Sequence, residues 1–151
     1  MTIGFNHLGR HGRLGNQMFQ YAGLRGIAAH RGFDFMIPQS DFKDEWTDHQ
    51  LFEAFKLSSL TNIGVCPGPY VQEAHFHFDE NLFNNMPDGH NVYAYLQSTK
   101  YFEHIEDEIR KDFEFKNHIY TPCKEMISSL DNPISLHVRR GDYITNSDNH
   151  P

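Results

Sequence analysis

Two short segments, near opposite ends of the chain, carry the residue types best suited to chemistry. The first is Gly12-Arg13-Leu14-Gly15-Asn16. Glycines in a turn before a helix let the backbone approach a ligand, and the helix N-terminus offers N–H groups to an anion. Arg13 adds a guanidinium that can grip phosphate oxygens through two hydrogen bonds. The spacing matches neither the dinucleotide-binding fingerprint nor a P-loop, so a purely conformational glycine-rich turn remains the alternative.

The second segment is the loop predicted to follow a strand at residues 134–138. It contains Arg139, Arg140 and Asp142, and His137 lies on the strand itself. Ligands of open α/β sheets bind beyond the carboxyl ends of the strands, where this loop is expected. Consecutive arginines point in different directions, so one is expected to face an anion while the other orders the loop with Asp142. His137 is either a catalytic group or, more commonly for a histidine on a strand, a satisfied core residue.

The first segment requires a strand before it and a helix after it. Residues 2–8 are predicted to form the strand. Asn16 is the expected N-cap of the helix and Gly32 its C′ residue. A second strand is expected at residues 33–37, which end before a proline.

Gly23 and Gly26 lie inside the predicted helix, where glycine is costly, so they indicate a thin face pressed against the sheet. A further strand is predicted near residues 92–96. A single amphipathic helix is then predicted at residues 98–113, capped by a serine or threonine. Alternating strands and helices favour an α/β fold with a Rossmann-like parallel sheet.

Composition excludes several classes of protein. The 151 residues include 13 Lys and Arg against 20 Asp and Glu, a net charge of −7, which argues against a nucleic-acid binder. The two cysteines do not form a disulfide framework, and we find neither a secretory leader nor a membrane-spanning run. The expected location is therefore cytoplasmic, or peripheral at a membrane surface. His75, His77 and Asp79 alternate like metal ligands, but without a further ligand nearby we predict no metal site.

Three segments resemble one family of enzymes. Residues 12–22, GRLGNQMFQYA, resemble the N-terminal signature of the α-1,2-fucosyltransferases, glycosyltransferase family 11. Residues 95–102, YLQSTKYF, are similar to the family's Y-x-Q-S-x-K-Y-F segment. Residues 137–143, HVRRGDY, resemble the H-x-R-R-G-D-Y peptide that the family shares with α-1,6- and protein O-fucosyltransferases. The three occur in the family's order.

The resemblance implies an inverting transferase that moves L-fucose from GDP-fucose to a galactoside hydroxyl, on a GT-B pair of Rossmann domains without a required metal. Arg139 or Arg140 would bind the donor diphosphate, together with the turn at Gly12 and Gly15. Arg13 and Asn16 would face the reacting centre from across the cleft. His137 and Asp142 are both candidates for the general base, and a reaction that needs no base is the alternative. The expected partners are GDP-fucose and a galactose-containing glycan.

The resemblance also implies that the chain is the N-terminal portion of such an enzyme. Residues 1–130 would form the acceptor-side domain, and residues 131–151 the first strand and arginine loop of a donor-binding domain. We expect little activity from the chain alone and a complementing C-terminal half as a partner. The alternatives are a non-catalytic remnant that acts as an interaction module and, less favoured, a general binder of nucleotide phosphates.

Overall fold

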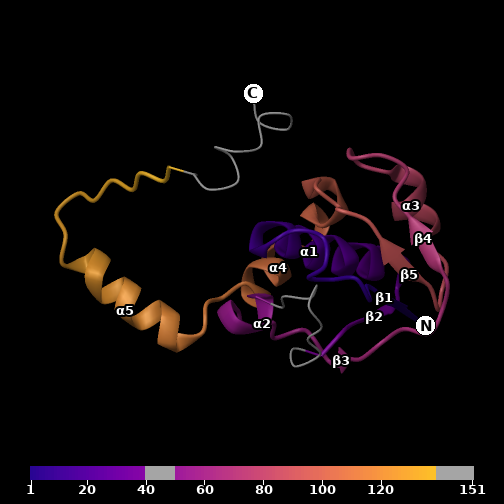
Figure 1. The fold of residues 1–151 in the computed structure, drawn as a ribbon, viewed down its shortest axis with the longest axis horizontal. Coiled ribbons are helices and arrows are strands. Elements are labelled where there is room, and N and C mark those ends of the chain that lie inside the picture. Colours follow the sequence, from indigo (N-terminus) through magenta and orange to yellow (C-terminus); the bar gives the residue numbers. More distant parts are fainter. Residues whose placement is uncertain (40–49, 139–151) are drawn as a thin grey trace. The chain divides into compact units, whose positions relative to one another are not determined.

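A computed structural model describes residues 1–39 and 50–138 of the chain. The described residues divide into two compact units, residues 1–117 and a second unit that begins at His118. The first unit is an α/β structure, as predicted from the alternation of strands and helices (Figure 1). The assignment of residues 131–151 to a separate donor-binding domain stays a prediction.

The first unit is built on a parallel sheet. Among the described residues, the sheet contains β1 (Thr2–Gly4), β2 (Asp34–Ile37), β3 (Asn62–Ile63), β4 (Tyr70–Gln72) and β5 (Asn91–Tyr93). The strand order is β3-β2-β1-β5-β4, and each pair of neighbours is parallel. The carboxyl ends of β1, β4 and β5 therefore lie at one edge of the sheet, where α/β folds place their ligands.

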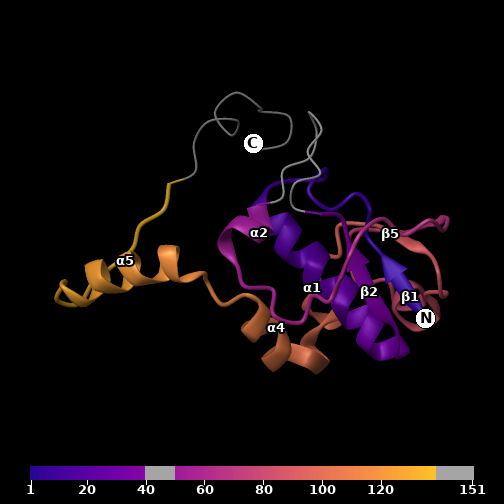
Figure 2. The same cartoon turned by 90° about the horizontal axis from the view of Figure 1, so that it is seen from below.

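Helix α1 (Leu14–Arg31) follows β1 and lies along the sheet against β1 and β2 (Figure 2). It ends as predicted, with Gly32 in the left-handed conformation at φ 67°. Its start differs from the prediction, because Arg13 and not Asn16 occupies the N-cap position. A side chain distant in sequence caps the first turn: the Leu14 N–H donates to Oε1 of Gln50, 3.0 Å away, in α2 (Gln50–Ala54).

The close approach predicted for Gly23 and Gly26 is present, but its partner is the chain that follows β5 and not the sheet. A Cβ on Gly23 would lie 2.7 Å from the Leu96 side chain. A Cβ on Gly26 would overlap the backbone carbonyl of Tyr101. Glycine at these two positions therefore lets residues 96–102 pack directly on α1.

Residues 98–113 do not form the single helix that their apolar spacing predicts. They form two 3-10 turns, η1 (Thr99–Tyr101) and η2 (Glu103–Ile105), and then helix α4 (Glu106–Asp112). Tyr101 is fully buried, and its hydroxyl donates to Oε1 of Glu73 while it accepts the Asp79 N–H. These tertiary contacts outweigh the local preference for a continuous helix.

The connection from β3 to β4 runs from one edge of the sheet to the other and is fixed at its middle by two asparagines. Nδ2 of Asn6 and Nδ2 of Asn91 both donate to the Cys66 carbonyl, each at 2.8 Å. Oδ1 of Asn6 accepts the Cys66 N–H in return. A Cβ on Gly4 would overlap the Cys66 side chain, so the segment packs directly on β1. The connection from β4 to β5 contains α3 (Glu80–Asn85).

The second unit contains α5 (Asn117–Ser128), which begins at the last residue of the first unit. The strand predicted at residues 134–138 is wrong for the described structure, because a strand needs a hydrogen-bonded neighbour and the described part of this unit supplies none. Ile134 is 95% exposed and Leu136 is 87% exposed. No helix in the described parts of the chain has the length and apolar character needed to cross a bilayer.

Candidate functional site

The glycine-rich segment forms the turn between β1 and α1. Gly9 and Gly12 both have positive φ, 88° and 89°, which favours glycine. At Gly12 a Cβ would also overlap the Asn16 side chain, so the backbone conformation alone favours glycine here, and its role beside a donor stays a prediction. Gly15 differs, because a Cβ there would meet nothing within 4 Å. The fold therefore does not require glycine at position 15.

A hydrogen bond joins this turn to the segment after β5. Nε2 of Gln97 donates to Oδ1 of Asn16 at 2.6 Å. Asn16 thus stands in the first turn of α1 and binds a side chain instead of capping the helix. Arg13, at the N-cap, is exposed and makes no capping hydrogen bond through its side chain. Arg13 belongs to the turn between β1 and α1, and its role in anion binding stays a prediction.

The remaining predicted site residues belong to the second unit or lie outside the described residues. His137 is described and exposed, which contradicts its reading as a core histidine on a strand. Arg139, Arg140 and Asp142 lie outside the described residues. The approach of these arginines to Arg13 around a diphosphate therefore stays a prediction.

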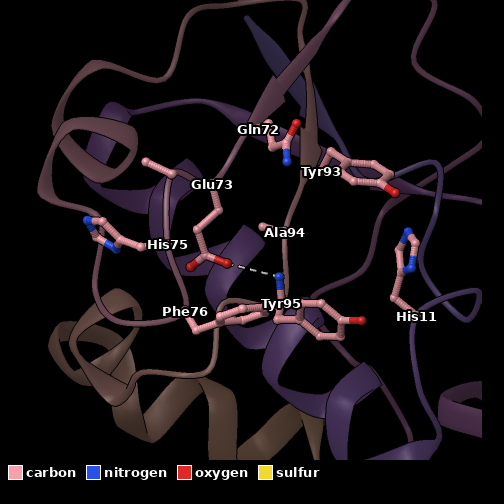
Figure 3. Close-up of a pocket in the computed structure, with 9 residues that line it drawn as sticks. His11, Gln72, Glu73, His75, Phe76, Tyr93, Ala94 and Tyr95 are labelled. Carbon is pink, nitrogen blue, oxygen red and sulfur yellow. Dashed lines mark hydrogen bonds between the residues drawn. The ribbon is translucent and has the colours of Figure 1, made fainter.

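A pocket of about 340 Å³ opens at the carboxyl ends of β4 and β5. Figure 3 shows Tyr95 and Phe76 along one side of it, with His11 and His75 on opposite sides. The ring of His11 makes an edge contact with Tyr93 at 4.9 Å and a tilted contact with Tyr95 at 5.9 Å between centroids. The turn after β1 and the end of β5 thus form one wall together.

Glu73 fixes the opposite part of the pocket. Oε2 of this carboxylate accepts the N–H groups of Tyr95 and Leu96, at 3.0 and 3.3 Å, and Oε1 accepts the Tyr101 hydroxyl at 2.9 Å. Burial raises the pKa of Tyr101, so its hydroxyl stays protonated and continues to donate. The Glu73 carboxylate is therefore occupied by structural hydrogen bonds that hold the chain after β5 in place.

His11 carries a ring nitrogen without a partner. Nε2 of His11 is buried and makes no hydrogen bond among the described residues. Burial, followed by the nearby Arg10 guanidinium, lowers the pKa of His11. The ring of His7 stacks on it with centroids 5.8 Å apart, and burial lowers the pKa of His7 as well. At neutral pH His11 is therefore an uncharged imidazole.

The alternating residues His75, His77 and Asp79 do not form a cation site. Their segment is not a strand, and the two imidazoles stack on each other with centroids 3.6 Å apart. The Asp79 carboxylate accepts the N–H groups of Leu82 and Ala74 and so caps α3. Among residues 1–39 and 50–138 no group of three or more histidine, cysteine or acidic side chains could hold a metal ion.

Sequence reasoning missed the pocket residues His11, Glu73 and Tyr93. A usable signal was the pair His7 and His11, four residues apart in a turn that follows a strand at a predicted ligand-binding edge. Glu73 gave no signal, because its role depends on contacts with residues more than twenty positions away.

Comparison with known proteins gives related enzymes over most of the chain. Galactoside alpha-(1,2)-fucosyltransferase 2 of Sus scrofa is 25% identical over 144 residues, which cover 88% of this chain and 40% of that protein. The Rattus norvegicus protein of the same name is 29% identical over 145 residues, with 88% and 39% covered. An alpha-1,2-colitosyltransferase of Escherichia coli is 24% identical over 160 residues, with 89% and 54% covered.

Other comparisons give no match: no family model matches the chain, and no solved structure matches it. The chain spans about two fifths of the length of the two mammalian relatives. These relatives share the activity that the three sequence segments had suggested. At the level of the family, the chain is related to the alpha-1,2-fucosyltransferases.

Proposed function

We propose that this chain is the acceptor-side part of a transferase that moves L-fucose from GDP-fucose to a galactoside hydroxyl with inversion. The observation that carries the proposal is the hydrogen bond from Gln97 to Asn16. It joins two segments that resemble the fucosyltransferase signature and that are separated by most of the first unit. The names of the relatives support the same activity.

In the proposed reaction, negative charge gathers on the departing GDP as the bond to fucose breaks. Fixed guanidinium groups stabilise such charge without reorganisation and without a divalent ion. We assign this role to Arg139 or Arg140, with Arg13 facing the reacting centre from the first unit. Asn16, held by Gln97, would orient the donor or acceptor beside the glycine-rich turn.

The proton of the acceptor hydroxyl requires an acceptor unless the transition state is strongly oxocarbenium-like. His137 and Asp142 are the candidates from the arginine segment. We propose metal-independent transfer, which predicts that a chelator leaves the rate unchanged.

The test is a transfer assay with GDP-fucose and lactose, with and without a separately expressed C-terminal portion of a related enzyme. We expect the complemented chain to transfer fucose and the chain alone to show little turnover. Arg139→Ala or Arg140→Ala should lower the complemented rate about 100-fold, the loss typical when a charge-stabilising donor is removed. Full transfer by both variants would contradict the assignment of the diphosphate site.

The rival function is a non-catalytic interaction module, which the exposed apolar residues Ile134, Leu136 and Val138 favour. These apolar side chains occupy alternate positions, and all three are open to a partner. Stable capture of the C-terminal portion without any transfer would support this function, and transfer would exclude it.

A further inference from the structure

The pocket beside His11 has the chemistry of a site for a neutral sugar. Its volume of about 340 Å³ lies at the lower end of the range for small-ligand sites, which suits a single ring. Phe76, which is 76% exposed, packs against Tyr95 with ring centroids 5.7 Å apart, so an aromatic surface borders the opening. Such rings pack against the C–H face of a pyranose.

The residues that line the pocket favour an uncharged occupant over the nucleotide. None of the described residues that line it is lysine or arginine. Glu73 contributes a carboxylate that is already bound by three donors, and a diphosphate placed beside it would be repelled. An uncharged polyol needs no cationic partner and is not repelled by the Glu73 carboxylate. Its hydroxyls can form hydrogen bonds with the hydroxyls of Tyr93 and Tyr95.

The unpartnered nitrogen of His11 supplies the missing polar contact. Nε2 is buried without a hydrogen bond, and an unsatisfied buried polar atom costs free energy until a ligand pairs with it. The neighbouring rings of His7 and Tyr93 pack against the imidazole and hold it in place. Figure 3 shows the Tyr93 and Tyr95 hydroxyls pointing toward the side of the pocket where His11 lies.

We propose that this pocket binds one neutral hexopyranose of the acceptor, with the ring face against Tyr95 and Phe76 and one hydroxyl donating to Nε2 of His11. The assignment rests on the proposed function for the choice of a galactoside. The axial 4-hydroxyl of galactose leaves three C–H groups on one face, which is the face that an aromatic surface accepts.

The test is a titration of the purified chain with methyl β-galactopyranoside, followed by saturation-transfer NMR without any donor. Tyr95→Ala should weaken binding about tenfold, since an aromatic contact contributes about 0.5–1.5 kcal/mol beyond its area. His11→Phe keeps a ring but loses the acceptor, and should weaken binding about fivefold, the equivalent of one hydrogen bond of about 1 kcal/mol. Tyr95→Phe should retain most of the affinity because it keeps the ring.

The matched controls are Tyr120→Ala and His118→Phe, two exposed positions on α5 in the second unit, which should bind the sugar as the parent chain does. Thermal melts of each variant separate loss of binding from loss of fold. The proposal would be overturned if Tyr95→Ala and His11→Phe bound methyl β-galactopyranoside as well as the parent chain does. It would also be overturned if GDP bound in this pocket more tightly than the sugar. Binding without transfer in the complemented assay would instead refute the proposed function and leave the sugar site standing.

Discussion

Replacement of Gly26 by alanine tests whether residues 96–102 are held on α1 by direct backbone contact. The new methyl group would overlap the carbonyl of Tyr101 and lie 2.9 Å from Cα of Phe102. Backbone atoms cannot rotate away, so the helix or the segment must shift. Overpacking of this kind costs about 1–3 kcal/mol. Alanine returns about 1 kcal/mol of helix propensity. Because the overlap is with backbone atoms, we take the overpacking cost near its upper value of about 3 kcal/mol. Subtracting the gain in helix propensity leaves an expected decrease of about 2 kcal/mol in the free energy of unfolding.

Gly15→Ala is the matched control, because it makes the same substitution in the same helix where a Cβ meets nothing within 4 Å. It should stabilise the protein by up to about 1 kcal/mol. Urea denaturation followed by circular dichroism at 222 nm measures both variants, with the slope of the transition as a check on two-state unfolding. A Gly26→Ala protein as stable as Gly15→Ala would refute the close contact. In the complemented transfer assay, a loss of activity in the stable Gly15→Ala protein would support an approach of the donor to this turn.

Three further predictions concern buried polar groups. Asp112→Asn removes the charge that pairs with Arg25 at 2.8 Å, and denaturation should report a loss of about 3 kcal/mol, since an unpaired buried charge is left behind. Asp79→Ala removes the N-cap of α3 and should cost about 1 kcal/mol in the same measurement. Burial lowers the pKa of His7 and of His11 below 6.5, so their contribution to stability is present above pH 6.5 and lost as the pH falls through the folded-state values. The melting temperature of the parent chain should therefore fall between pH 7.5 and pH 5. The double variant His7→Phe and His11→Phe should show a smaller fall over the same range. An equal pH dependence of the melting temperature in both proteins would contradict the burial of these rings.

The sequence predicted the elements whose signals are local. The strand–turn–helix at the N-terminus, the glycine stop at Gly32 and the strand near residue 92 were all found where a cap, a turn residue or an apolar run marks them. Asn16 was misread because a side chain from α2 replaces the local cap at Leu14. The short strands β3 and β4 gave too few residues for a period to be recognised.

Only those parts of the candidate site that belong to a recognisable sequence motif were predicted. The glycine-rich turn and Gln97 belong to segments with a recognisable pattern, and the structure brings them together. The pocket beside them was not foreseen, because Glu73, Tyr93 and His11 come from three separate segments. Their meeting depends on β5 inserting between β1 and β4, an order that no local pattern encodes.

That strand order has a consequence for synthesis on the ribosome. The unit from β1 through α1 to β2 can assemble as soon as about forty residues have emerged, because its partners are adjacent in the chain. The other flank of β1 is filled by β5, whose residue Asn91 pairs with Gly4. Until that residue has been translated, the nascent protein presents an open strand edge to solvent. Chaperone binding to arrested nascent chains should therefore be strongest for those that stop between β2 and β5.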